Sequence, residues 1–238
     1  MTAVFTATTF ELLAAIARTP TAAFYMERKA DFKAHVEQPL QGLMRRSALH
    51  LPVMMRERME TQRNLFSRFI KNDFGRGGAW SNYWGAFYPR GSRRLEDVQL
   101  ALWINARRLG ISFYIGDYAR LPRERFLRNV KRYRQILPDL LADLVNDPHV
   151  LLSREGGERE DAAGNLVPEH PIGWSEWLDD PRSADFWVRV ALSPAQAIAA
   201  TTAELEALAI HMHAAYFPLA LLAIEDNPLP VIDAYLEG

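Results

Sequence analysis

Two neighbouring segments constrain the fold of this chain most strongly. In residues 98–105 (VQLALWIN), an aliphatic residue occupies every second position from Val98 to Ile104, so one face of an extended strand would be apolar. Residues 111–115 (ISFYI) are enriched in β-branched and aromatic side chains, and the short connection between the segments carries Gly110. So short a connection favours an antiparallel hairpin, because parallel strands need a much longer crossover.

Four further segments have the β-branched or aromatic enrichment of strands. They are residues 64–70 (NLFSRFI), 82–88 (NYWGAFY), 150–153 and 186–191 (FWVRVA). Helical spacing and capping residues predict helices at 10–18, 21–38, 39–51, 122–137 and 193–217, with a helical turn or two at 54–63. Pro218 is expected to interrupt or restart the last helix. We therefore expect an α+β fold with helices packed on one face of an antiparallel sheet of about five or six strands.

No repeat or long linker divides the chain, so we expect one α+β domain over residues 1–238. Its expected parts are a helical lead (1–62), the sheet with a helix (63–153), an acidic insertion (154–183), and a strand with C-terminal helices (184–238). The insertion is rich in Gly, Pro and acidic residues, which predicts a mobile loop.

The residue types present argue against a metal, a cofactor or catalysis. The chain has no Cys, which excludes disulfides, thiol nucleophiles and zinc ribbons and favours a reducing compartment such as the cytoplasm. His211 and His213 are two residues apart, so on a helix they point about 200° apart and cannot share a metal ion. No Ser-His-Asp set, GxSxG motif or HExxH motif is present.

Two other clusters have simple explanations. The glycines of residues 75–78 lack the ending of a nucleotide-binding P-loop, so they predict a turn or an arginine-bearing loop that touches phosphate. The acidic residues Glu155, Glu158, Glu160 and Asp161 are interpreted as solvated loop charge.

One apolar stretch, residues 207–224, has the length of a membrane span. Acidic residues flank both of its ends, and no Lys or Arg follows Arg189. Spanning helices normally have basic flanks, so we expect a buried core helix and no membrane partner. The N-terminus has no basic start followed by an apolar run, so we expect no signal peptide.

Charge is divided between two opposed blocks. Residues 56–134 hold eighteen basic and seven acidic side chains, and residues 135–238 hold four basic and eighteen acidic ones. Three interpretations are open. The two blocks pair with each other across the fold, both blocks are solvated, or the basic block forms a polyanion-binding face. Arg dominates the basic block, and its planar fork of donors matches phosphate.

The basic block is also rich in aromatic residues. Arginines surrounding aromatic side chains are the usual means of stacking a nucleic-acid base while holding its phosphates. The alternative is that these aromatic residues belong to the core. The expected nucleic-acid-binding residues are Lys71, Arg76, Arg90, Arg93 and Arg94 for phosphate, and Trp80, Trp84 and Tyr88 for stacking.

The chain also resembles a known family in the types of its residues and in their order along the sequence. Residues 63–118 (RNLFSRFIKNDFGRGGAWSNYWGAFYPRGSRRLEDVQLALWINARRLGISFYIGDY) resemble the N-terminal region of McrB/MoxR-like bacterial AAA+ ATPases. Residues 10–43 (FELLAAIARTPTAAFYMERKADFKAHVEQPLQGL) are similar to the start of a widespread uncharacterised bacterial domain family. The tail PLALLAIEDNPLPVIDAYLEG resembles the stretch that precedes such an ATPase domain, although Walker A and Walker B motifs are absent.

The resemblance implies a DNA-recognition module of a defence-type restriction ATPase. Such a module reads DNA, single-stranded or with a modified base, and its partner is a fused or separate AAA+ ATPase. Two alternatives stay open: a protein-interaction or regulatory domain of such an ATPase, and an unrecognised small-molecule enzyme.

Overall fold

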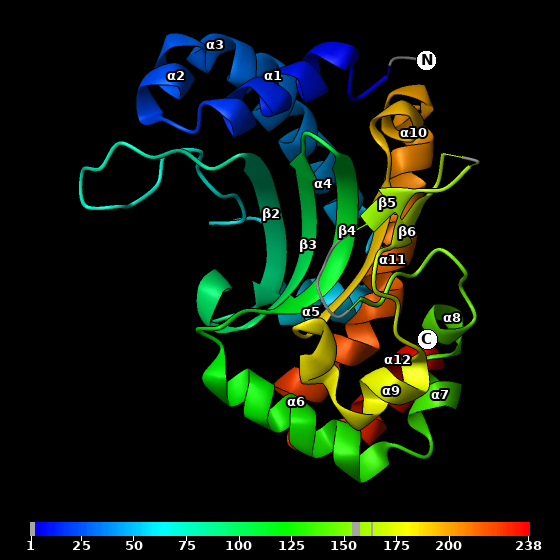
Figure 1. The fold of residues 1–238 in the computed structure, drawn as a ribbon. Coiled ribbons are helices and arrows are strands. Elements are labelled where there is room, and N and C mark those ends of the chain that lie inside the picture. The colour runs from blue at the N-terminus through cyan, green and yellow to red at the C-terminus, as the bar shows by residue number, and fades with distance from the viewer. Residues whose placement is uncertain (1–2, 154–157, 163) are drawn as a thin grey trace.

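The computed structural model describes residues 3–153, 158–162 and 164–238. Its centre is a five-stranded antiparallel sheet with the order β1-β2-β3-β4-β7 (Figure 1). The strands are β1 (Met59–Glu60), β2 (Asn82–Pro89), β3 (Val98–Asn105), β4 (Arg108–Ile115) and β7 (Trp187–Leu192). The α+β class, the antiparallel sheet and its strand number are therefore as the sequence predicts.

The predicted central hairpin is confirmed. β3 spans the predicted residues 98–105, and it pairs with β4 along its whole length, from Val98 opposite Ile115 to Asn105 opposite Arg108. The aliphatic positions of β3 are fully buried on one face. The register is fixed because a slip by one residue would turn these side chains to the other face.

Two of the predicted strands are wrong. Residues 64–70 and 150–153 contact neighbouring strands only through isolated bridges, such as Phe66 with Gly85 and Leu151 with Arg189. The outer edge of β2 is shared, because β1 pairs with its end and the Leu65 carbonyl accepts a hydrogen bond from the Ala86 amide. β1 and the segment around Leu65 each pair with too little of β2 to form a regular ladder. The sequence predicts a helical turn or two at 54–63, so the strand β1 is a correction of that prediction.

Helices cover one face of the sheet, and Figure 1 shows α4 and α11 behind the strands. The N-terminal helices are α1 (Ala7–Arg18), α2 (Ala22–Glu27), α3 (Lys29–Phe32), a π-helical turn (Lys33–Glu37), α4 (Gln38–Leu49) and α5 (Val53–Arg58). Those after β4 are α6 (Arg120–Tyr133), α7 (Leu137–Leu140) and α8 (Ala142–Val145). After β7 come α10 (Pro194–Ala199), α11 (Thr202–Ile224) and α12 (Leu229–Leu236). Together with the sheet they enclose one contiguous apolar core that runs from Phe5 to Ile232.

The helix predicted at 193–217 is broken near residue 200, between α10 and α11, and not at Pro218 as the sequence predicts. Thr201 caps α11 by accepting a hydrogen bond from the Glu204 amide, and Glu204 caps the Thr201 amide in return. This capping box starts a new helix there. Pro218 lies inside α11 without ending it, because the fully buried residues Phe217 and Leu219 anchor both sides of the proline.

The acidic insertion contains regular structure. Its described residues form a small hairpin, β5 (Glu158–Glu160) with β6 (Leu166–Pro168), and the helix α9 (Trp174–Asp179). Trp177 of α9 is fully buried in the core. Glu155 lies outside the described residues, and the mobility of the insertion stays a prediction.

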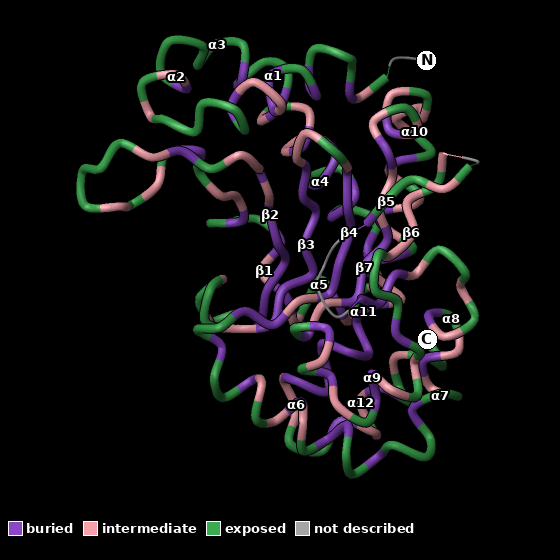
Figure 2. Tube along the Cα trace, in the orientation of Figure 1, coloured by how far each residue is buried: buried purple, intermediate pink, exposed green. Residues whose placement is uncertain are grey.

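α11 is long and apolar enough to cross a membrane by length and composition. It packs between the sheet, α4 and α6, and a buried helix of a soluble protein has the same composition. Asn129 of α6 donates hydrogen bonds to the carbonyls of Leu222 and Glu225 at the C-terminal end of α11. The structure is compatible with a soluble protein, and Figure 2 shows the strands in front of α11 buried along most of their length.

His213 of α11 makes folding stability depend on pH. It is fully buried against the ring of Phe87, and burial lowers its pKa to about 4 from an ordinary 6.5. The unfolded chain therefore binds more protons between pH 4 and 6.5, and this contribution to stability is present above pH 6.5 and is lost as the pH falls to 4. Its size is about 3 kcal/mol.

We expect the His213→Leu variant to lose this contribution. The free energy of unfolding, measured by chemical denaturation, should fall between pH 7 and pH 4 in both proteins. The fall should be about 3 kcal/mol smaller in the variant than in the parent protein. Carboxylates elsewhere titrate equally in both proteins and cancel. An identical pH dependence of the two proteins would contradict the assignment.

Candidate functional site

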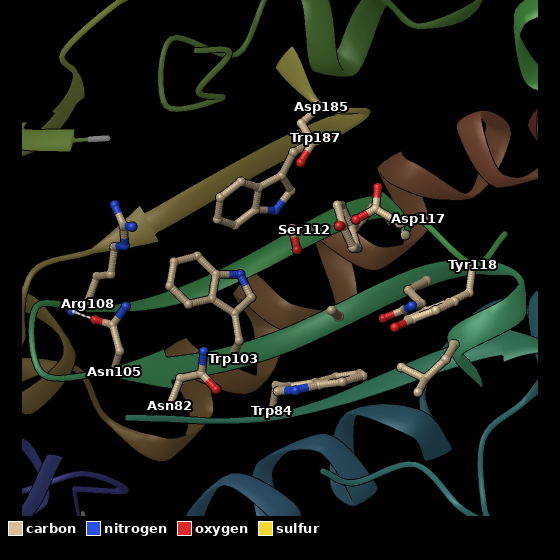
Figure 3. Close-up of a pocket in the computed structure, with 15 residues that line it drawn as sticks. Asn82, Trp84, Trp103, Asn105, Arg108, Ser112, Asp117, Tyr118, Asp185 and Trp187 are labelled. Carbon is tan, nitrogen blue, oxygen red and sulfur yellow. Dashed lines mark hydrogen bonds between the residues drawn. The ribbon is translucent and has the colours of Figure 1, made fainter. Parts of the chain in front are cut away.

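The sheet face opposite α4 and α11, here called the open face, holds a cavity of about 490 Å³. Ala101 and Ser112, which are paired across β3 and β4, form part of its floor. Trp84, Trp103 and Trp187 stand around these small residues (Figure 3). Small side chains at the centre and large ones at the margin produce a hollow in the sheet surface.

The alternation of the strands places each tryptophan on the open face. Trp84 lies directly opposite Trp103 across β2 and β3, and the next residue in that row is Gly110 of β4. A Cβ atom at Gly110 would lie 2.1 Å from Trp103 Cζ2. Only glycine therefore lets the Trp103 indole lie across β4. Trp103 also contacts Trp187, with 5.5 Å between the ring centroids.

A guanidinium group lies over each of the three indole rings. The distances from Cζ to the ring centroid are 4.5 Å for Arg94 and Trp84, 5.2 Å for Arg108 and Trp103, and 4.2 Å for Arg189 and Trp187. These contacts fix the orientation of the rings and place positive charge around the cavity. The cavity is thus both aromatic and cationic.

Polar groups at the cavity can orient a ligand. Gln99 and Ser112 are buried in its floor, and Asn82 and Asn105 lie at one end. Amide and hydroxyl groups offer both donors and acceptors to the edge of a planar ring.

Two carboxylates at the opposite end of the cavity face a cation. Asp117 and Asp185 pair with Arg123, at 2.8 and 3.7 Å. Burial raises the pKa of Asp185 and that of the nearby Tyr114 hydroxyl. Two carboxylates thus share one guanidinium group, so with both ionised this end of the cavity carries one net negative charge.

A buried charge cluster adjoins the cavity. Glu158 of the β5–β6 hairpin forms ion pairs with both Arg108 and Arg189. Burial lowers the pKa of Arg189 to about 10, and burial together with the charges of Arg189 and Arg107 lowers that of Arg108 to about 10. The interpretation of Glu158 as solvated charge is wrong, because its side chain has no exposed surface. The reason is that β5 lays it against the inward-turned arginines of β4 and β7.

The residues expected to contact phosphate lie along the outer edge of β2, in the loops before and after this strand. Arg76 and Arg93 are exposed, and Arg90 donates to the Arg56 carbonyl. Arg94 is half-buried and donates to the Asn64 carbonyl while it covers Trp84. With Arg63, Arg68 and Lys71 they form what we call the basic edge. Within the described residues, only Arg93 of this group forms an ion pair, with Glu96.

The structure separates the three aromatic residues expected to stack on bases. Trp84 is half-buried and lines the cavity. Trp80 is half exposed in the loop before β2, with Lys71 Nζ 4.4 Å from its ring centroid. Tyr88 is only 5% exposed, and its hydroxyl donates to the Arg63 carbonyl. Tyr88 is thus packed into the structure at the end of β2 and does not present its ring outward.

Sequence reasoning missed part of the site. Neither Trp103, which lies in the basic block, nor Trp187 is among the residues that the sequence predicts to stack on bases. The signal was available in the alternation of 98–105, which turns Trp103 away from the aliphatic face. The same alternation in 187–192 puts Trp187 and Arg189 on one face.

Ion pairs between the basic and acidic blocks account for part of the charge. Within the described residues, six of the eighteen basic residues of 56–134 pair with acidic residues of 135–238. They are Arg58, Arg108, Arg123, Arg125, Arg128 and Arg134. Five of the six follow β3, whereas the basic edge precedes it, so the cations near the outer edge of β2 stay available to an external anion.

The sequence matches no protein-family model and no curated protein sequence. Among the described residues, no group of three His, Asp or Glu side chains is placed to hold a metal ion.

Gly110 allows the arrangement of the cavity to be tested. In the Gly110→Ala variant the new methyl group collides with the Trp103 indole, so the ring must move. We expect a loss of about 1–3 kcal/mol in unfolding free energy, which is typical of overpacking. Tryptophan emission should also shift to longer wavelength as the ring leaves its 9%-exposed position.

Gly173→Ala is the matched control, since a Cβ atom there meets nothing within 4 Å. Emission and stability of the Gly110→Ala variant equal to those of this control would show that Trp103 does not lie across β4.

Proposed function

We propose that this domain binds nucleic acid without catalysis of its own, with one unstacked base in the tryptophan cavity and the adjoining phosphates on the basic edge. The observation that carries the proposal is the cavity of about 490 Å³ lined by Trp84, Trp103 and Trp187. Indole rings stack on bases of any sequence and are a common means of holding a base outside a duplex.

The charge around the cavity supports an anionic ligand. Arg94 connects the two parts of the proposed site, because it covers Trp84 and belongs to the basic edge. Arg76, in the loop before β2, and Arg93, in the loop after it, are exposed and add further positive charge to the basic edge. An aromatic cavity beside exposed arginines matches the base and the backbone of one strand.

The buried amide and hydroxyl groups support base readout. Gln99 and Ser112 in the floor, with Asn82 and Asn105 at one end, can form hydrogen bonds to the edge of a base. Single-stranded DNA and DNA with a modified base are the ligands that we propose first. The resemblance to McrB/MoxR-like N-terminal regions supports the further proposal that the domain serves a cytoplasmic AAA+ ATPase, fused or separate.

A salt titration with oligonucleotides tests the division of labour between stacking and phosphate contacts. The Trp84→Ala variant should lose about 1–3 kcal/mol of binding free energy with little change in salt dependence, because stacking releases no counterions. The Arg76→Ala/Arg93→Ala double variant should bind every sequence more weakly. Its slope of log K against log salt should be smaller by about 1.4, which corresponds to two contacts on a single strand.

Arg120→Ala is the control for the double variant. Arg120 is exposed and pairs with Glu124 on α6, and it is not one of the residues that form the basic edge. Binding of single- and double-stranded DNA and RNA, with and without base modification, identifies the preferred ligand. An unchanged salt slope in the double variant would remove the basic edge from the proposal, and full affinity in Trp84→Ala would remove the cavity.

A further inference from the structure

We propose that a second cavity, formed by α4, α5 and the residues that follow β1 and β2, binds two neighbouring phosphate groups through Arg45, Arg56 and Arg90. Its volume is about 530 Å³, and we call it the arginine cavity. It shares no lining residue with the tryptophan cavity. That the phosphates belong to a nucleic-acid strand rests on the proposed function, whereas the anion site itself does not.

Three segments bring the arginines together. Arg45 lies on α4, Arg56 on α5, and Arg90 directly follows β2. β1 follows α5 and pairs antiparallel with the end of β2. The Arg90 amide continues this pairing with a hydrogen bond to the Arg58 carbonyl, so Arg90 is placed beside the last turn of α5.

Two of the three guanidinium groups are held by neighbouring groups. Nη2 of Arg90 donates a hydrogen bond of 2.8 Å to the Arg56 carbonyl, an acceptor in the last turn of α5. The Arg45 guanidinium lies over the Phe66 ring, with 5.5 Å from Cζ to the ring centroid. A side chain that is already positioned loses less freedom when it binds a ligand.

The arginine cavity has a surplus of positive charge. The described residues that line it include three arginines and no carboxylate. Glu60 acts on Arg90 from outside this lining. Burial opposes the ionisation of Glu60, but hydrogen bonds from the Gln62 and Arg63 amides and the charge of Arg90 lower its pKa. One carboxylate does not balance three guanidinium groups, so the cavity attracts an anion.

Phosphate is the anion that suits this lining. The planar fork of a guanidinium group donates two parallel hydrogen bonds to phosphate oxygens. Three such groups from separate segments, around about 530 Å³, suit two neighbouring phosphates, because a single phosphate would leave most of the volume unfilled. Thr61 and Gln62 add hydroxyl and amide groups, and Ala48 and Leu49 form an apolar wall for a sugar.

The arginine cavity extends the basic edge. Arg90 belongs to both, and Gln62 of the cavity precedes Arg63 of the basic edge. Arg90 lies six residues beyond Trp84, or about 20 Å along an extended chain. The phosphates in the arginine cavity are therefore several nucleotides away from a base that stacks on Trp84.

Inorganic pyrophosphate tests the anion site on the full chain without nucleic acid. At about 10 mM it should raise the midpoint of thermal unfolding by about 3–5 °C more than chloride of equal ionic strength does. The Arg45→Gln/Arg56→Gln variant should lose this rise; both residues lie outside the tryptophan cavity and the basic edge. Arg45→Lys/Arg56→Lys should keep part of it, since lysine retains the charge without the fork.

Lys131→Gln/Arg132→Gln is the matched control, because it removes the same charge. Both residues are exposed on α6, and Arg132 lies over the Tyr133 ring as Arg45 lies over Phe66. This control should keep the full rise in midpoint. A rise no larger than that with chloride, or an equal rise in Arg45→Gln/Arg56→Gln and the parent protein, overturns the arginine cavity as an anion site.

Oligonucleotides identify the source of the phosphates and separate this inference from the proposed function. For a single strand of about twelve nucleotides, the slope of log K against log salt should be smaller by about 1.4 in Arg45→Gln/Arg56→Gln, which corresponds to two contacts. A dinucleotide is too short to reach from Trp84 and should show no difference. An unchanged slope, with a pyrophosphate effect that needs the two arginines, identifies a free phosphorylated molecule. If no oligonucleotide binds, the proposed function fails, and the pyrophosphate result decides on the anion site by itself.

Discussion

The packing of one face of the sheet against α11 is the interaction on which the site depends. The aliphatic residues of β3 and β4 are buried there, and this burial fixes the register of both strands. A fixed register turns Trp84, Trp103 and Ser112 to the other face at set positions. The rigidity of the cavity is thus supplied by the core on the opposite face of the sheet, since side chains packed at crystal-like density hold the strands in place.

Charge is used differently on the two sides of the fold. Arginines of α6 pair with acidic residues near the C-terminus, as Arg125 and Arg128 do with Asp226. These exposed pairs contribute little to stability and cancel charge locally. The arginines near β2 have almost no carboxylate partners among the described residues, so the positive potential concentrates along one edge of the sheet. A net charge of −1 for the whole chain conceals this division.

Sequence patterns predicted the helices and strands whose formation depends on residues close together in the chain. The alternation in 98–105 identified β3, and capping residues such as Thr21 marked helix starts. Patterns could not show that Tyr88 is covered by the segment near Arg63, because that contact depends on tertiary packing of an irregular loop. The burial of Glu158 was hidden for the same reason. Its sequence neighbours are glycine and charged residues, and only the position of β5 against β4 and β7 brings two arginines to it.

The geometry of the three tryptophans limits how many rings the cavity can hold. Trp103 and Trp187 are already in contact, with ring planes tilted by 51°, so a flat ligand cannot enter between them. Trp187 is further occupied by Tyr114, 6.3 Å away in an edge-to-face contact. The remaining indole, Trp84, is half-buried and lies on β2 as the cross-strand neighbour of Trp103. A base bound as we propose would therefore have one stacking partner in Trp84 and one wall in Trp103, so the cavity suits a single base rather than a run of stacked bases.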